Sequence, residues 1–134
     1  MSLDQALTDA MKTMPDCVAA GYVDMSSGML LGVSTLDSHP QEVLDLVAAA
    51  TADMFQGPTV TQIEDAFNKS RGGKKGDQSY FQELLVFSEN LIHVFLRTQQ
   101  YPDHVIAFVT RKSANIGMVL VKSRMAVAGI TDAV

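Results

Sequence analysis

The last third of the chain constrains the fold most, because three strand-like runs there are followed directly by a helix. These runs are rich in β-branched, aromatic and leucine residues and cover residues 80–88, 91–99 and 104–110. Two and four residues separate them, which is short enough for hairpins. Ser113 or Asn115 can then cap a helix that ends near Gly129. The pattern predicts an antiparallel meander closed by a helix, and no catalytic motif interrupts it.

The N-terminal part of the chain predicts a helix and a hairpin. Apolar residues recur at helical spacing between Ser2 and Pro15, and Ser2 has the capping-box spacing from a glutamine three residues later. Residues 17–24 and 29–34 then form two strand-like runs. Gly28 lies between them and suits the positive φ of a tight turn.

A second long helix is predicted over residues 39–56. Ser38 and Gln41 repeat the capping-box spacing at its start, and Gly57-Pro58 gives a strong signal for its end. Its apolar residues cover more than one side, and such a helix is usually buried on more than one side. We therefore expect one face on the sheet and another on a second subunit.

The order of elements is α-β-β-α-β-β-β-α, which predicts an α/β (α+β) fold. We expect a five-stranded antiparallel sheet with helices on both faces. The 134 residues, with 47% hydrophobic and 19% charged residues, are expected to form one domain over 1–134. Residues 59–71 are expected to add a turn or two of helix. Residues 72–78 are predicted to be a flexible segment, either a connector or a basic docking loop.

Charge and composition exclude several classes of function. The net charge is −5, and a net acidic chain binds nucleic acid poorly because phosphate contacts need basic residues. No apolar run approaches the roughly 20 residues of a membrane span, and no signal segment precedes the first helix. We expect a cytoplasmic protein. Cys17 is the only cysteine, so no intrachain disulfide is possible.

No constellation of residues predicts catalysis, a metal site or a cofactor. His39, His93 and His104 lie in three different predicted elements and have no metal-ligand spacing. Two classes of function remain open: a non-catalytic interaction module, and a small-ligand sensor of the PAS or profilin-like type. A sensor should have a cavity with a few convergent polar groups, whereas an interaction module should expose an apolar or charged patch.

The third strand-like run favours a homodimer. A hydrophobic edge strand is an aggregation risk unless it is paired or covered. Pairing two copies of it across a two-fold axis would continue the sheet and bring the two second helices together. We predict that Leu46, Ala50, Phe81 and Leu85 lie in the dimer interface.

The chain resembles the Roadblock dynein light-chain family over about residues 3–130. The resemblance rests on the order of elements, the small residues 19–21 of the first strand, the glycine hairpin and Ser113-Ala114-Asn115-Ile116-Gly117-Met118-Val119-Leu120. A similar Asn-Leu/Ile-Gly opening begins the last helix of that family. Residues 58–78 depart from the pattern, because this passage is longer than usual.

The resemblance implies a profilin- or longin-like fold with the second helix on one face of the sheet and the first and last helices on the other. It also implies homo- or heterodimerisation through the second helix and third strand. Ras-like small GTPases, or the subunits of a motor or signalling assembly in which the chain is a scaffold, are the implied partners. On this basis we predict a partner-binding surface at Glu42, Asp45, Ala49 and Asp53, which are three or four residues apart and share one side of the helix.

Overall fold

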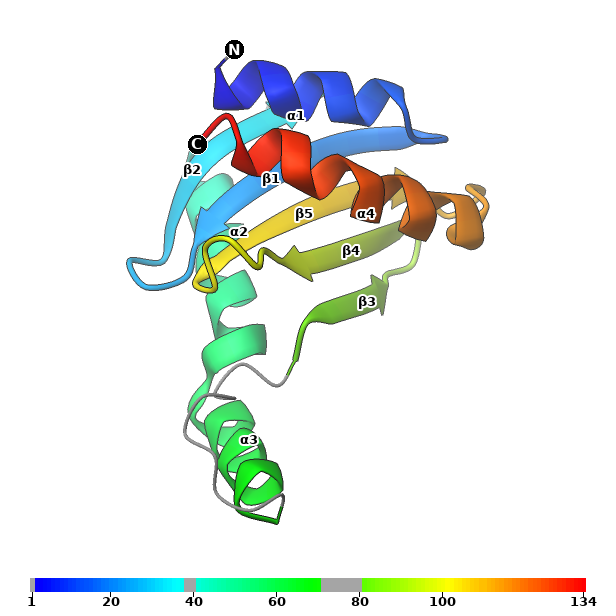
Figure 1. Ribbon diagram of the computed structural model, residues 1–134. Helices are drawn as coiled ribbons and strands as arrows, with labels where there is room; N and C mark the ends of the chain where they lie inside the picture. The colour runs from blue at the N-terminus through cyan, green and yellow to red at the C-terminus, as the bar shows by residue number, and fades with distance from the viewer. Residues whose placement is uncertain (1, 38–40, 71–80) are drawn as a thin grey trace.

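The computed structural model describes residues 2–37, 41–70 and 81–134. Its five strands form one antiparallel sheet in the order β2-β1-β5-β4-β3 (Figure 1). The strands are β1 Cys17–Asp24, β2 Met29–Thr35, β3 Glu83–Phe87, β4 Leu91–Arg97 and β5 His104–Arg111. The helices are α1 Leu3–Lys12, α2 Gln41–Gln56, α3 Pro58–Ser70 and α4 Ile116–Thr131.

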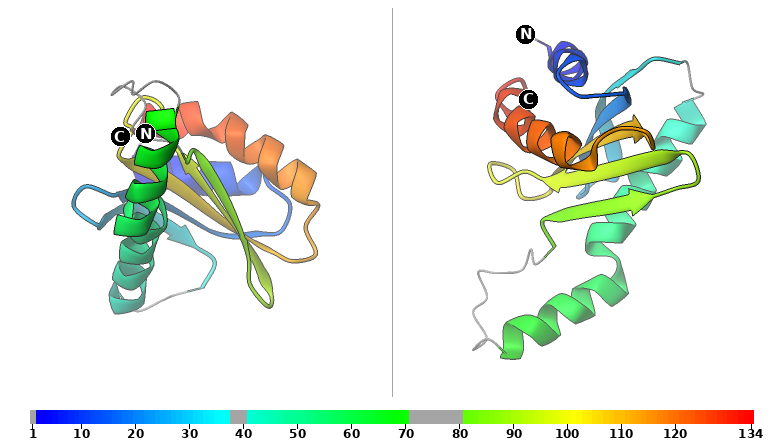
Figure 2. Two further views of the ribbon diagram at one scale, coloured as in Figure 1. Left: turned by 90° about the horizontal axis from the view of Figure 1, so that it is seen from below. Right: turned by 90° about the vertical axis from the view of Figure 1, so that its right-hand side faces the viewer.

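The helices cover the two faces of the sheet unequally. Helices α1 and α4 lie on one face and α2 lies on the other, while α3 extends past the edge formed by β3 (Figure 2). The predicted α+β fold, its element order and its two helical layers are therefore confirmed. Helix α3 is an additional helix between α2 and β3.

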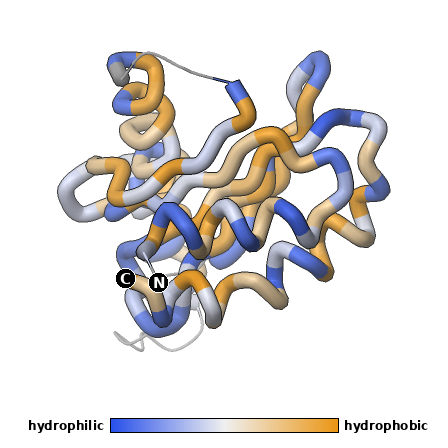
Figure 3. The backbone as a smooth tube through the Cα atoms, turned by 90° about the horizontal axis from the view of Figure 1, so that it is seen from above, coloured by the Kyte–Doolittle hydropathy of each residue, from blue (hydrophilic) through white to orange (hydrophobic). Residues whose placement is uncertain are grey.

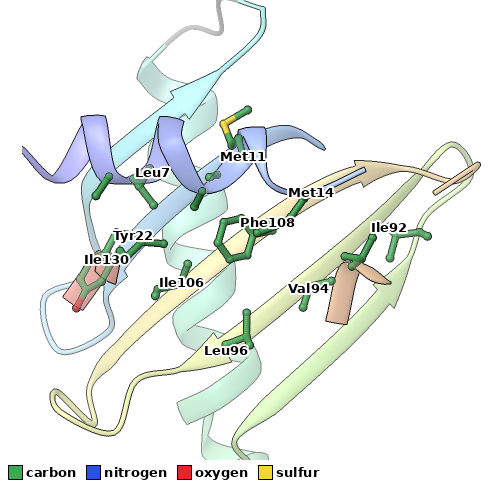
Figure 4. Packing of buried hydrophobic residues seen from close by; sticks show 14 residues of the cluster. Leu7, Met11, Met14, Tyr22, Ile92, Val94, Leu96, Ile106, Phe108 and Ile130 are labelled. Carbon is green, nitrogen blue, oxygen red and sulfur yellow. The ribbon is translucent and has the colours of Figure 1, made fainter. Parts of the chain in front are cut away.

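The larger core lies between the sheet and the pair α1 and α4. Leu7, Tyr22 and Phe108 have no exposed surface and pack there together (Figure 4). Alternate strand residues supply this core, as the two-residue period of a strand requires. The strands in the middle of the molecule are accordingly mostly hydrophobic, and the turns at their ends are hydrophilic (Figure 3). Each large side chain that is fully buried contributes about 1.5–3 kcal/mol.

The smaller core lies between the opposite face and α2. Only three described residues of α2 are buried, namely Ala48, Thr51 and Phe55. Ala48 and Phe55 pack with Val23, Phe95, Val105 and Ala107 of the sheet. Because so little of α2 is buried, most of its surface remains exposed.

Helix ends follow the predicted capping with one difference, which is at Ser2. Asn115, rather than Ser113, caps α4, and its Oδ1 accepts a hydrogen bond of 3.1 Å from the Met118 N–H. Ser2 Oγ accepts one of 3.1 Å from the Gln5 N–H, but the Gln5 side chain donates to Asp9 instead of completing the capping box. The predicted cap at Ser38 lies outside the described residues, as does the predicted flexible segment 72–78.

Two element lengths differ from the prediction. Helix α3 has 13 residues, not a turn or two, because Pro58 begins a new helix immediately after α2 ends. Proline is favoured at the first helical position, where no intrahelical donor is lost. Strand β3 covers five residues, fewer than the run predicted over residues 80–88.

Strand β2 forms one edge of the sheet, and α1 covers part of it. The outward N–H of Val33 donates a hydrogen bond of 3.0 Å to Asp4 Oδ1. Thr8 Oγ1 and Ser34 Oγ lie 2.8 Å apart next to this contact. A β-carbon on Gly32 would lie 2.8 Å from Leu3 Cγ, so the absence of a side chain at Gly32 allows this close approach.

Two alanine substitutions test this packing. Gly32→Ala should lower the free energy of unfolding by about 1–3 kcal/mol, because α1 must move away from β2. Gly129→Ala is the matched control, since a β-carbon there meets nothing within 4 Å. It should raise stability by about 0.5–1 kcal/mol, because alanine favours the helix. Urea unfolding of both variants at one protein concentration gives the two signs, and equal effects would contradict the assignment.

Candidate interaction surface

Large apolar side chains of α2 are exposed on its outer side and on one flank. Leu46 is 70% exposed, Val47 50% and Val43 45%. A contiguous exposed apolar patch commonly marks a binding surface. The inward residues of the helix, Ala48 and Phe55, lie on its opposite side, as 3.6 residues per turn requires.

The predicted partner-binding residues all lie on the outer side of α2. Glu42, Asp45, Ala49 and Asp53 are exposed, and Leu46 lies among them. The structure therefore brings these four residues together, as their spacing predicts. Their arrangement combines a protruding apolar side chain with three carboxylates.

An apolar groove runs along one flank of α2. It has a volume of about 480 Å³ and lies between α2 and the sheet face beneath it. Val43, Val47, Ala107 and Val109 are among its lining residues. A second helix laid beside α2 would fill such a groove.

His93 is one of the few polar groups in this groove. Its ring stacks on Phe95 with a centroid separation of 6.4 Å, and its Nε2 lies 3.2 Å from Ser88 Oγ. Burial lowers the pKa of His93, which favours the neutral ring. The histidine thus adds little charge to an otherwise apolar surface.

Strand β3 forms the second edge of the sheet. The C=O of Gln82 accepts from β4, and the N–H of Ser88 donates to it, so the even-numbered residues of this strand bond inward. Because antiparallel ladders alternate, the N–H and C=O groups of Glu83, Leu85 and Phe87 point outward. Leu85 is 41% exposed and Phe87 56%. This edge has the backbone groups and the apolar side chains that strand pairing needs.

The four residues predicted to lie in the dimer interface differ in their location and in their burial. Leu46 and Ala50 are exposed on α2, and Leu85 is exposed at the β3 edge. Leu85 pairs with Val94 and so lies on the face of α1 and α4. Phe81 is partly buried, because it packs into the core beneath α2.

Arg97 is a buried residue beneath this surface, and the sequence pattern does not indicate its structural role. Its side chain is 7% exposed, its Nε donates to the Phe81 C=O at 3.0 Å, and its Nη1 donates to the Pro102 C=O at 2.7 Å. The guanidinium lies 5.2 Å from the centre of the Phe55 ring. Desolvation lowers the pKa of Arg97 from a very high ordinary value, so it stays charged. Arg97 therefore joins α2 to the start of β3.

One group of titratable residues lies elsewhere, at the ends of β1 and β5. Tyr22 Oη is 2.7 Å from His104 Nδ1, and His104 Nε2 is 4.0 Å from Asp24 Oδ1. Burial raises the pKa of Tyr22 to about 12, so the phenol stays protonated. No group of three or more metal-ligating side chains occurs in the described parts of the chain. No described helix is long and apolar enough to cross a membrane.

The arrangement defines a class: a five-stranded antiparallel sheet with one long helix on one face and two on the other. This is the Roadblock fold. A Roadblock/LC7 domain from Streptomyces avermitilis superposes with a TM-score of 0.68 at 14% identity, over 98% of this chain and 97% of that one. Myxococcus xanthus MglB superposes with a TM-score of 0.70 at 12% identity, over 97% and 92% of the two chains. The gliding protein MglB from Thermus thermophilus gives 0.69 at 16% identity, over 98% and 87%.

The fold implied by the sequence resemblance is thus confirmed. Comparison with protein-family models found no match, and comparison with curated protein sequences found none either.

Substitution of Arg97 tests its role as the connection between α2 and β3. Arg97→Gln should lower the free energy of unfolding by about 2–3 kcal/mol, because two carbonyl groups lose a charged donor. Arg124→Gln is the control, since Arg124 forms an exposed ion pair with Glu83 at 2.8 Å and should change stability little. Thermal unfolding of the two variants measures the difference, and equal losses would argue against the assignment.

Proposed function

We propose that the chain is a non-catalytic, homodimeric interaction module that binds or regulates a Ras-like small GTPase or serves as a scaffold in a motor or signalling assembly. Two observations carry the proposal: the exposed apolar side chains of α2, and the edge of β3, whose outward backbone groups can pair with another strand. Dimerisation and partner identity follow from the Roadblock resemblance together with this surface. A Ras-like partner implies a cytoplasmic location.

Two features support dimerisation through β3. Its outward backbone groups can pair with a second copy of the strand, and antiparallel pairing of identical strands has two-fold symmetry. The groove beside α2 offers apolar surface for the second copy's helix. The exposed residues Leu46 and Ala50 belong to the same helix. Burial of this surface supplies the free energy of association.

Removing one backbone donor tests the dimer. Leu85→Pro eliminates an N–H that points away from β4, so it should prevent pairing without breaking the internal ladder. The variant should sediment as a monomer at concentrations at which the unchanged chain is a dimer. Leu85→Val keeps the donor and should remain dimeric. Circular dichroism confirms that both variants are folded, and a folded, dimeric Leu85→Pro variant would contradict pairing at this edge.

The acidic outer side of α2 supports a basic partner surface. Glu42, Asp45 and Asp53 surround Leu46, and Ala49 leaves room for close approach. Carboxylates arranged in this way accelerate encounter with a positively charged protein. We assign Glu42, Asp45, Ala49 and Asp53 to the partner, and Leu46, Ala50 and the groove side of α2 to the second subunit.

Charge reversal tests the partner surface. The double variant Glu42→Lys/Asp45→Lys should slow association with the host's Ras-like GTPases roughly tenfold and weaken its dependence on salt. The fold should be unchanged, because exposed charges contribute little to stability. Asp9→Lys/Asp132→Lys makes the same change in net charge on the opposite face and serves as the control. Stopped-flow association at low and high salt gives the rates, and identical rates for the two double variants would refute the surface.

A small-ligand sensor is the second candidate, and the groove is the observation that favours it. The groove is apolar but has His93 and Arg111 in its lining. If it is a ligand site, an apolar fluorescent dye should bind the dimer at one molecule per chain. If the second copy's helix fills it, the dye should bind the Leu85→Pro variant and leave the dimer unlabelled. Fluorescence titration of the two proteins separates these outcomes.

A further inference from the structure

Helix α3 lies outside the body of the domain, beyond the β3 edge. It packs against the end of α2 and extends past the last strand (Figures 1 and 2). The dimer proposed above is formed across this same edge. A second copy that pairs with β3 must therefore meet α3.

Helix α3 has an apolar side that is partly exposed. Val60, Ile63 and Phe67 are three and four residues apart and so share one side of the helix. Ile63 is 39% exposed and Phe67 44%. The opposite side carries polar residues, so α3 is amphipathic.

Helix α3 lies nearer the start of β3 than its end (Figure 1). The charge of Glu64, which is 6% exposed, acts on Arg97, and Arg97 donates a hydrogen bond to the Phe81 C=O just before β3 begins. Both observations associate α3 with the start of the strand.

Two-fold symmetry then determines what α3 meets. When two copies of β3 pair antiparallel, the start of one strand lies beside the end of the other. The end of β3 carries Phe87, which is 56% exposed, and the turn that contains Glu89 follows. Helix α3 of one copy is thus opposite Phe87 of the second copy.

We propose that the apolar side of α3 binds the Phe87 end of β3 in a second copy of this chain, so that two α3 helices clasp the dimer at both ends of its strand pair. This inference rests on the proposed dimer and adds an interface element to it. If α3 encloses the Phe87 ring, the interface buries more apolar surface than pairing of the two strands would bury alone.

The size of the interface supports the same conclusion. A stable interface uses about 20–30 residues on each side. Strand β3 has five residues, and nine described residues of α2 are exposed, of which only one side can face a partner. Helix α3 adds ten exposed residues at the required edge.

Disulfide trapping between two chains tests the contact. In a Cys17→Ala background, one chain carries Ile63→Cys or Phe67→Cys and the other carries Phe87→Cys. Each chain then has one thiol, so a heterodimeric disulfide can form only between copies. The control pairs Phe87→Cys with Met125→Cys, a residue that is 69% exposed on α4 and lines a groove between α1 and α4. Mass spectrometry after mild oxidation identifies the linked chains.

We expect at least one α3 pair to cross-link tenfold or more faster than the Met125 control. Equal rates in a sample that sediments as a dimer would overturn the clasp and leave the proposed dimer intact. A chain that sediments as a monomer would overturn both.

Affinity measurements give a second, independent test. Ile63→Asp and Phe87→Asp should each raise the dimer Kd at least tenfold, whereas Met125→Asp should not. The double variant should raise the Kd by less than the product of the single effects, because both changes remove one contact. Fully multiplicative effects would contradict direct contact between these two positions.

Discussion

One helix cannot cover one face of this sheet, and much of the structure follows from that mismatch. A helix is about 10 Å wide, whereas a strand of eight residues such as β1 is about 26 Å long. Two helices solve the problem on the face of Phe108, where the core is closed. On the other face α2 is alone, so the apolar groove beside it stays open. The side of α2 that has no second helix is therefore where apolar surface stays exposed.

Arg97 compensates for the thin core on that side. A buried guanidinium with two carbonyl acceptors and an aromatic neighbour connects α2 to the start of β3. The charge of Glu64 also acts on this guanidinium, so α3 interacts with it as well. One side chain thus interacts with α2, α3 and the start of β3. A rigid arrangement of this kind lowers the entropic cost of binding.

Most of the fold could be predicted from the sequence because its signals are local. The β-branched and aromatic residues of β5, the turn at Gly28 and the end of α2 at Gly57 are each local signals. The four residues predicted to bind a partner share a side because helical spacing alone decides that. The direction of Leu85, the partial burial of Phe81 and the role of Arg97 depend on which strands are neighbours. That information comes from tertiary packing and is absent from any local pattern.

The contact between Asp4 and the β2 edge limits how far this sheet can grow. A sheet with two open edges can add copies head to tail and form fibres, because each addition presents a new edge. Here the carboxylate of Asp4 already occupies the Val33 N–H, so a strand arriving at β2 would lose that bond before it gained its own. Of the two strand edges, β3 is then the one at which pairing costs no existing bond of this kind, and two-fold pairing there would close after two copies. A single aspartate on the first helix thus protects the edge through which the sheet could otherwise be extended into a polymer.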